Sequence, residues 1–252
     1  MTQQLFILTG ASRGMGLSLA QQLLRPGHTV LGLSRQPNDT LAAAAQAAGA
    51  TLLQWPQNLA RTAEAAARLE QWLAAQDGSA FVGGATLINN AGVIPRIGPL
   101  DESDAADIAH ALRVGLEAPM LLTAAFLRAT HGWAAPRKVL NISSGLGRRA
   151  MAGQAGYCAA KAGMDHFTHC AALDEAPRPN GARLVSLAPG VIDTDMQAQL
   201  RAGDEAGFPD RANFINLKEK GQLSSPAEAA ERILAYLARA DFGANPVADV
   251  RD

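Results

Sequence analysis

Residues 5–16 of the chain read LFILTGASRGMG, an apolar run from Leu5 to Leu8 that leads into glycines at positions 10, 14 and 16. The apolar run predicts a buried β-strand, and the pattern from Met15 to Leu24 predicts a helix. The glycines then lie at a tight strand-to-helix turn, where a phosphate group can approach the backbone N–H groups of the helix N-terminus. Glycines needed only for close packing would give the same pattern, so the turn alone does not identify a ligand.

Short apolar runs continue to alternate with helix-length segments along the chain. The runs lie at Thr29–Leu33, Thr51–Leu53, Thr86–Ile88, Val139–Ile142 and Leu184–Leu187, and helical patterns lie at Leu41–Ala48 and Ala63–Ala75. Strands that alternate with helices pair in parallel, with right-handed crossovers and both faces buried. The sequence therefore predicts an α/β fold, a single doubly wound Rossmann-type domain over residues 1–252 with a parallel sheet flanked by helices.

Two segments differ in composition from the rest of the chain. The alanine-rich stretch Ala42–Ala50 is predicted to be a surface helix, because alanine is the best helix former and Gly49 offers a C-cap. The segment Gly190–Asn213 is rich in glycine, proline and polar residues and is interpreted as irregular. Long irregular segments often close over a binding site, so we expect a substrate lid at about 190–213.

The overall composition favours a small-molecule partner. The chain has 252 residues, 48% of them hydrophobic, and a formal net charge of -1, so nothing suggests nucleic acid as a partner. Cys158 and Cys170 form no metal-spaced cluster, which suits a reducing compartment and predicts no bound metal. No leader pattern and no apolar run of membrane-spanning length is present, so we expect a cytoplasmic protein that does not enter membranes.

The choice of cofactor is expected to depend on the end of the second strand. An acidic residue there would bind the adenosine ribose of NAD, but this sequence has Ser34 and Arg35. Arg13 in the glycine turn is expected to converge on the same point, and two guanidinium groups would bind a 2′-phosphate. The sequence therefore favours NADPH, although either arginine alone has the alternative of being an ordinary solvated charge.

A second group of residues suggests acid–base chemistry. Tyr157 and Lys161 are four residues apart on a predicted helix and so share one face. A neighbouring lysine cation and a positive nicotinamide ring would lower the pKa of the phenol, which could then exchange a proton with a carbonyl oxygen. Ser144 ends a predicted strand and could hydrogen-bond the same oxygen. Taken singly, such a pair is usually on the surface and such a serine is usually in a turn.

The joint order of these motifs resembles the short-chain dehydrogenase/reductase family. Thr9 precedes the G-x-x-x-G-x-G turn, Asn89-Asn90-Ala91-Gly92 matches the N-N-A-G motif, and Ser144, Tyr157-x-x-x-Lys161 and Pro189-Gly190-Val191-Ile192-Asp193-Thr194 follow in the family's order. The resemblance implies that Tyr157 is the acid–base, Ser144 orients the carbonyl, and Lys161 lowers the pKa of Tyr157 and binds the nicotinamide ribose.

The resemblance also implies a set of cofactor-binding residues. Besides Tyr157 and Lys161, these are Gly10, Ser12, Arg13, Gly14, Met15, Gly16, Ser34, Arg35, Asn58, Leu59, Asn90, Ala91, Gly92, Pro189, Gly190, Ile192 and Thr194. Asn58 stands where the family often has an acidic residue, and its amide oxygen can still accept from the adenine amino group. Family members usually pair through the helices around the Tyr position, which implies a homodimer or homotetramer.

One family residue is missing from this chain. The helix after N-N-A-G normally presents an asparagine that holds a water linking the lysine to bulk solvent, and Gly115 occupies that position. Three interpretations follow: a reductase with a water-filled relay, a slow reductase, or a cofactor-binding protein with a regulatory role. The presence of Ser144, Tyr157 and Lys161 favours the first two, because a binder would not need them.

The second half of the chain resembles sepiapterin reductases and benzil-type carbonyl reductases in particular. The similar stretches are Tyr157–Ala162, Ala188–Gln197 and Asn216–Leu223. This resemblance implies a vicinal dicarbonyl substrate, either a diketone or the side chain of an oxidised pterin. Met151, Met196, Phe208 and Phe214 are candidates for the pocket wall, with core filler as the alternative. Asp249 aligns loosely with the pterin anchor, and its alternative is a terminal strand residue with its carboxylate in water.

Overall fold

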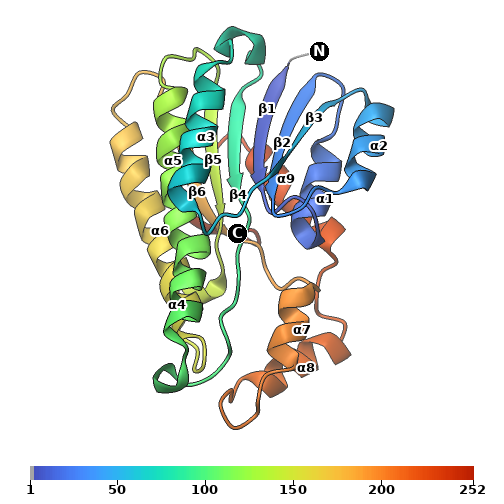
Figure 1. Cartoon of the computed structure of the whole chain (residues 1–252), viewed down its shortest axis with the longest axis vertical. Coiled ribbons are helices and arrows are strands. Elements are labelled where there is room, and N and C mark those ends of the chain that lie inside the picture. The colour runs from blue at the N-terminus through green and yellow to red at the C-terminus, as the bar shows by residue number, and fades with distance from the viewer. Residues whose placement is uncertain (1–2) are drawn as a thin grey trace.

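The computed structural model describes residues 3–252 and contains one seven-stranded parallel sheet (Figure 1). Its strands follow the order β3-β2-β1-β4-β5-β6-β7. Their bounds are Gln4–Thr9 for β1, His28–Ser34 for β2, Thr51–Pro56 for β3, Ala85–Asn89 for β4, Arg137–Ile142 for β5, Arg183–Ala188 for β6 and Val247–Asp249 for β7. The predicted doubly wound Rossmann-type fold is thereby confirmed.

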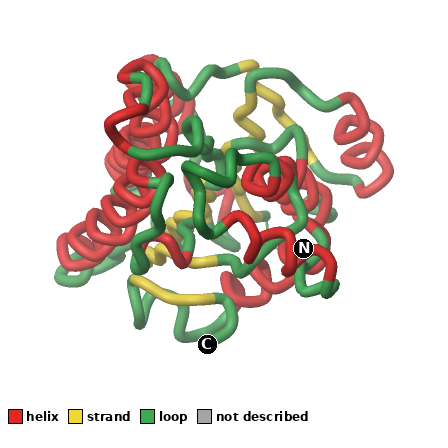
Figure 2. The backbone as a smooth tube through the Cα atoms, turned by 90° about the horizontal axis from the view of Figure 1, so that it is seen from below, coloured by secondary structure: helices red, strands yellow, loops and turns green. Residues whose placement is uncertain are grey.

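Helices cover both faces of the sheet because the buried strands alternate their side chains between two cores. Phe6 and Leu8 of β1 enter one core, and Leu5 and Ile7 enter the other. The first core lies under α1 (Gly14–Leu23), α2 (Asp39–Ala48) and α9 (Pro226–Ala238). The second lies under α3 (Thr62–Ala74), α5 (Ala118–Ala129) and α6 (Ala155–Glu175). Figure 2 shows red helices on both sides of the yellow strands.

The carboxyl ends of the strands point toward the lower end of the molecule in Figure 1, where α7 (Asp195–Arg201) and α8 (Arg211–Glu219) lie. On the other side of the same end, α4 (Ala105–Leu112) continues through a π-helical turn at Arg113–Glu117 into α5. Ligands of open α/β sheets bind at the carboxyl ends of the strands. The fold therefore predicts a ligand site between α4 on one side and α7 and α8 on the other.

The segment 190–213 differs from the sequence interpretation. It was expected to be irregular, but it contains all of α7 and the beginning of α8. The helix α7 is short and has only two strongly apolar residues, Met196 and Leu200, so its sequence pattern is weak. Leu200 packs with Phe208 and Phe214 in a third apolar cluster, and this tertiary contact stabilises the helix.

Candidate functional site

A glycine turn joins β1 to α1 at the carboxyl edge of the sheet. Gly10 and Gly14 have φ angles of 72° and 54°, a region that favours glycine. A Cβ on Gly16 would clash with Gly10 O, so the turn can close only with a glycine there. The side chain of Arg13, the N-cap residue, makes no capping hydrogen bond, which leaves the first N–H groups of α1 available to an anion.

Thr9 and Asn90 hold this turn against β4. Asn90 Nδ2 donates to Thr9 O at 3.0 Å, and Thr9 Oγ1 accepts from the backbone N–H groups of Asn90 and Ala91, each at 3.0 Å. The N-N-A-G motif therefore fixes the geometry of the glycine turn. The neighbouring Asn89 is buried and donates to Asn141 Oδ1 at 2.8 Å, which ties β4 to β5.

The end of β2 lies beside the turn and carries no carboxylate at positions 34 and 35. Ser34 Oγ donates to Gln36 O at 2.7 Å, and Arg35 is exposed. Arg13 was expected to converge on Arg35, but its Nη1 donates to Asp195 of α7 at 3.0 Å. Asn58 Oδ1 accepts from Ala60 N at 3.0 Å, so this amide oxygen is engaged in a local turn. Within residues 3–252 Arg35 has no ion-pair partner, whereas Arg13 is paired with Asp195, so Arg35 is the one of the two that presents a free cation here.

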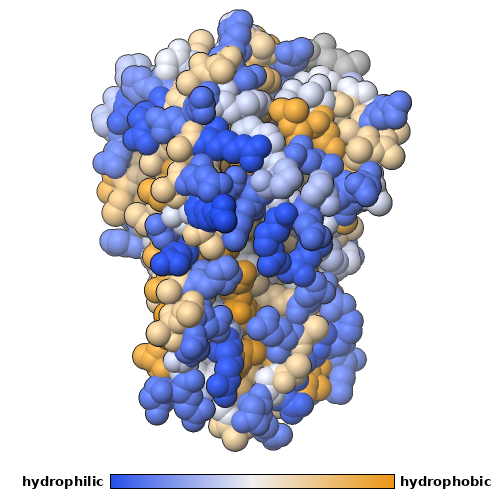
Figure 3. Space-filling model, in the orientation of Figure 1, coloured by the Kyte–Doolittle hydropathy of each residue, from blue (hydrophilic) through white to orange (hydrophobic). Residues whose placement is uncertain are grey.

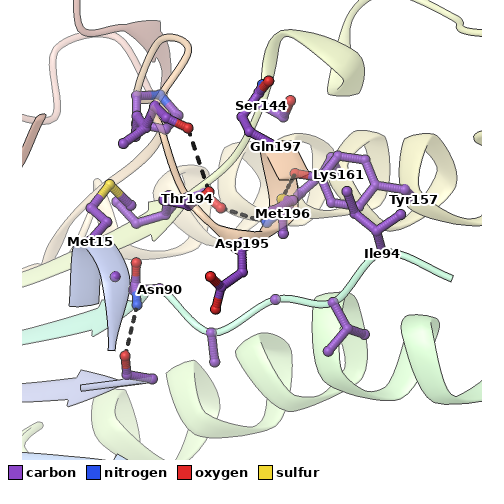
Figure 4. Close-up of a pocket in the computed structure, with 18 of the residues that line it drawn as sticks. Met15, Asn90, Ile94, Ser144, Tyr157, Lys161, Thr194, Asp195, Met196 and Gln197 are labelled. Atoms are coloured by element: carbon purple, nitrogen blue, oxygen red, sulfur yellow. Dashed lines mark hydrogen bonds between the residues drawn. The ribbon is translucent and has the colours of Figure 1, made fainter. Parts of the chain in front are cut away.

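The three residues expected to carry the chemistry lie together. Ser144 follows β5, and its Oγ accepts from Leu146 N at 3.2 Å. Tyr157 and Lys161 lie one turn apart on α6, with the lysine Nζ 5.7 Å from the centroid of the phenol ring. Figure 4 shows them beside Met196 of α7, whose sulfur is 3.9 Å from the Tyr157 hydroxyl.

Burial controls the ionisation of Tyr157 and Lys161. It raises the pKa of Tyr157 to about 12, with the Ser144 hydroxyl opposing the rise. It lowers the pKa of Lys161 to about 8, with Asp165 opposing the fall. Desolvation is the largest cause of the shift in the Tyr157 pKa, and Lys161 is not among its causes, since the lysine Nζ donates to Ile142 O at 2.7 Å. The lowering expected from Lys161 together with a nicotinamide ring stays a prediction.

An apolar wall closes the end of the site beyond Tyr157. Met151, Leu200, Phe208 and Phe214 form a buried cluster, in which the two phenylalanine rings stack with centroids 5.6 Å apart. Met151, Met196 and Phe214 face the cavity, whereas Phe208 is fully buried behind it. Figure 3 shows hydrophobic side chains inside the hollow between the α4 side and the α7–α8 side of the molecule.

Asp249 at the end of β7 also faces this cavity, but its carboxylate already has a partner. Arg251 forms two hydrogen bonds of 2.6 Å to its two oxygens, and this ion pair is the main cause of a lowered pKa of Asp249. The Asp249 side chain is only 15% exposed, so the alternative of a carboxylate in open water is also not what the structure shows. A pterin ring would have to displace Arg251 to reach it.

Gly115 lies in the middle of the π-helical turn between α4 and α5 and is buried. A Cβ added there would lie 3.2 Å from the Cβ of Ala160 on α6, which is a tight contact. The close approach of the two helices therefore provides a packing reason for glycine at this position.

One cavity of about 1500 Å³ joins the glycine turn to the acid–base pair. All the residues predicted from the sequence to bind the cofactor line it, together with Ser144, Met151, Met196 and Asp249. The continuous space runs from the glycine turn, past Ser144 and Tyr157, to the apolar wall under α7 and α8. The same cavity is therefore lined by a turn that can bind phosphate and by an acid–base pair.

A family model described as short chain dehydrogenase matches residues 4–205. The chain belongs to the short-chain dehydrogenase family. A benzil reductase ((S)-benzoin forming) from Bacillus cereus is 34% identical over 238 residues, which cover 94% of each protein. A sepiapterin reductase from Bos taurus is 30% identical over 267 residues, 98% of this chain and 94% of that protein. These relatives confirm the resemblance found in the sequence.

A solved structure has the same fold as this chain. The crystal structure of a 3-oxoacyl-[acyl-carrier protein] reductase from Brucella melitensis in complex with NAD has a TM-score of 0.81 to this protein at 22% identity. The match covers 99% of this chain and 96% of that chain. Among residues 3–252, no helix is both long and apolar enough to cross a membrane.

The cavity of this family member fits a nicotinamide dinucleotide. The uncapped N-terminus of α1 and the close turn at Gly16 suit a pyrophosphate, and Asn90, Pro189 and Ile192 line the cavity beyond it. Thr194 begins α7, and its Oγ1 lies 3.5 Å from Ile192 O. These residues present backbone and hydroxyl groups, as expected for the nicotinamide end.

Several residues of the cavity were missed by sequence reasoning. Gln154, Gln197, His110, Arg149 and Arg251 all line it. Gln154 could have been found, because it precedes Tyr157 by three residues and so lies one helical turn away from it. For the others, the pattern of the sequence contains no signal of this kind, since their position depends on how α4, α7, the loop after β5 and the C-terminal segment pack.

Proposed function

We propose that this protein is an NADPH-dependent reductase that converts a carbonyl group of a vicinal dicarbonyl compound into an alcohol. The observation that carries the proposal is the placement of Ser144, Tyr157 and Lys161 in one cavity with the glycine turn. Each group has a role in such a reduction, and an anion-binding turn continuous with an acid–base pair suits hydride transfer from a dinucleotide.

The mechanism divides the work between cofactor and protein. The bound dinucleotide supplies the hydride that reaches the carbonyl carbon. The phenol of Tyr157, with its pKa raised to about 12, stays protonated at neutral pH and gives its proton to the carbonyl oxygen. The Ser144 hydroxyl hydrogen-bonds that oxygen as negative charge develops. The Nζ of Lys161 lies 5.7 Å from the centroid of the Tyr157 ring and contributes positive charge near the phenol.

Arg35 supports the choice of NADPH over NADH. It is exposed at the end of β2, next to a serine instead of a carboxylate, so a 2′-phosphate would meet a cation and no repulsion. A guanidinium group binds phosphate through paired hydrogen bonds that an adenosine hydroxyl does not offer. The ratio of kcat/KM for the two cofactors tests this choice.

A dicarbonyl substrate is supported by two independent observations. The wall formed by Met151, Met196 and Phe214 is apolar, which suits aryl or alkyl groups on a ketone. The benzil reductase from Bacillus cereus, named for a diketone substrate, aligns with this chain over 94% of its length. The engagement of Asp249 by Arg251 makes a diketone a better candidate than a pterin.

We also propose how the chain works as a whole. Residues 1–252 would act as one reductase domain, with residues 190–213 as a lid that opens for the substrate and closes over it. The contact between Met196 and Tyr157 supports this role for the lid. The protein would act in the cytoplasm on a small molecule, without nucleic acid or membrane, as a homodimer or homotetramer.

An alternative function is that of an NADP(H)-binding regulatory protein with weak or no activity. Gly115 favours it, because the family's relay asparagine is absent at this position. The experiment that separates the two functions follows NADPH oxidation at 340 nm with benzil, 1-phenylpropane-1,2-dione, quinones, aldehydes and sepiapterin. Turnover of a diketone supports the reductase, whereas tight NADPH binding without turnover of any substrate supports the alternative.

A further inference from the structure

The side chain of Gln154 is buried at the cavity without any hydrogen-bond partner. The residue is 1% exposed, and neither Oε1 nor Nε2 contacts a polar atom within the described residues 3–252. Its backbone, in contrast, is engaged, because its N–H donates to Met151 O at 3.3 Å and its carbonyl accepts from Cys158 N at 2.9 Å. Only the amide group lacks partners, and buried amides normally have them.

A capping role does not explain this amide. Gln154 is the N-cap residue of α6, yet its side chain makes no capping hydrogen bond. At α2 and α4, in contrast, the N-cap side chain does cap: Asn38 accepts from Thr40 N at 2.9 Å, and Asp104 accepts from Asp107 N at 3.0 Å. The amide of Gln154 therefore does not stabilise its own helix.

The position of Gln154 connects it to the substrate end of the cavity. It lies one helical turn before Tyr157, and both residues line the cavity. The preceding Gly153 packs against the lid segment so closely that an added Cβ would lie 2.8 Å from Gly207 O. Gly153 O also accepts from Gly98 N at 3.1 Å. Gln154 thus lies where α6, the lid segment and the loop after β4 meet.

We propose that Gln154 determines substrate specificity by donating a hydrogen bond from Nε2 to a second oxygen of the substrate, on the carbon next to the reacting carbonyl. This inference rests on the proposed function. Tyr157 and Ser144 hold the reacting oxygen, so a neutral donor one helical turn away suits the neighbouring oxygen of a vicinal dicarbonyl. The surrounding wall of Met151 and Phe214 is apolar, so an amide without a partner beside it can distinguish a substrate with the second oxygen from one without it.

The chemistry of an amide limits the class of ligand. It carries no charge, so it offers no strong attraction to a phosphate or a carboxylate, and it can donate to a ketone oxygen as well as accept from a hydroxyl. A site built to hydrogen-bond an oxygen disfavours the analogue that lacks it, because its own polar group then stays unpaired. A simple ketone with the same carbon skeleton should therefore be a much poorer ligand.

The test compares the wild-type protein with Gln154→Met on two matched compounds. Methionine has a similar length and no amide, 1-phenylpropane-1,2-dione has the second oxygen, and propiophenone lacks it. The dissociation constant of each compound is measured by calorimetry on the complex with NADP⁺, which cannot deliver hydride, and kcat/KM is measured with NADPH. Gln46→Met, an exposed exchange on α2, is the control for the chemistry of the substitution.

The expected result is a loss of affinity for the dione and not for propiophenone. Gln154→Met raises the dissociation constant of the dione at least tenfold, equal to about 1.4 kcal/mol, and the corresponding change for propiophenone is at least tenfold smaller. The affinity for NADP⁺ stays within twofold of wild type. If Gln154→Met fails to fold, as judged from its melting temperature, Gln154→Asn withdraws the amide by one methylene and is expected to show the same selectivity.

Three results for Gln154→Met would each overturn the proposal. Equal losses for both compounds would assign Gln154 to the general shape of the site, a loss of NADP⁺ affinity would assign it to the cofactor, and unchanged affinity for the dione would leave it no role in recognition. Absence of wild-type turnover counts against the proposed function alone, because the dissociation constants still report on the amide. If the wild-type complex binds no dione, the role of Gln154 is also refuted.

Discussion

Arg13 of the glycine turn and Asp195 of α7 form an ion pair of 3.0 Å, although they are 182 residues apart in the chain. Their side chains are 70% and 82% exposed, so the pair contributes little to stability. Its consequence is geometric, because it joins the glycine turn to α7 and directs Arg13 away from the end of β2. Arg35 is then the main candidate for recognition of a 2′-phosphate.

Replacing Arg35 by aspartate should change the cofactor preference. Arg35→Asp removes a charge-assisted contact with the 2′-phosphate and adds repulsion against it. The ratio of kcat/KM for NADPH over that for NADH should therefore fall about tenfold to a hundredfold, which corresponds to about 1.5–3 kcal/mol. Asp195→Asn, which breaks the pair with Arg13, is the control and should change this ratio less than threefold. A larger effect of Asp195→Asn than of Arg35→Asp would mean that Arg13 is the selective residue.

The lowered pKa of Lys161 predicts a specific dependence of stability on pH. Below pH 8 the lysine is charged in both states, and burial of the cation destabilises the fold. Above pH 8 the folded protein releases the proton, while the unfolded chain keeps it up to its ordinary pKa of 10.5, so stability rises with pH.

The free energy of unfolding, measured in urea for wild type and Lys161→Met, tests this dependence. The difference between the two proteins should shift by about 2 kcal/mol in favour of wild type from pH 7.5 to 9.5. Other titrating groups are shared by both proteins and cancel in the difference. A difference that stays constant over this range would show that Lys161 keeps its ordinary pKa.

Gly115→Asn tests the missing relay residue. The added side chain meets Ala160 on α6, so the substitution should destabilise the protein by about 1–3 kcal/mol in a thermal melt and increase kcat by less than tenfold. The double variant Gly115→Asn with Ala160→Gly relieves the contact and should recover part of the stability. A tenfold or larger gain in kcat in the double variant would show that this protein is a handicapped enzyme.

Much of the fold could be predicted from the sequence because its signals are local. The apolar run Leu5–Leu8 becomes the centre of β1, and Gly49 takes the left-handed conformation of a C-cap, with a φ of 63°. The three-residue strand β7 is different, because it is defined only by its pairing with β6. The helix α7 likewise depends on Leu200 reaching the cluster around Phe208.

The site also has features that the sequence predicts and features that depend on tertiary contacts. The spacing of the motifs was sufficient to predict that Tyr157, Lys161 and the glycine turn line one cavity, since each motif has a fixed place in a Rossmann-type fold. The sequence gives no measure of desolvation, so the raised pKa of Tyr157 was not anticipated. The pairing of Arg251 with Asp249 was also missed, because the two residues approach only through the turn after β7.

Asp249 and Arg251 allow a test between a pterin and a diketone. If the carboxylate only holds Arg251, Asp249→Ala and Arg251→Ala should each change KM for 1-phenylpropane-1,2-dione and for sepiapterin by similar, small factors. A carboxylate that binds a pterin would behave differently: Asp249→Ala would raise KM for sepiapterin at least about tenfold, or about 1.4 kcal/mol, and would spare the diketone. Steady-state kinetics with both substrates distinguish the two outcomes.

Tyr157→Phe tests whether Tyr157 gives the proton in a carbonyl reduction that consumes NADPH. The measurement follows NADPH oxidation at 340 nm with a diketone and, separately, the dissociation constant of NADPH. We expect kcat to fall at least about a hundredfold while NADPH affinity changes less than threefold, because only the proton donor is removed. Retention of most of the wild-type kcat in Tyr157→Phe would contradict it.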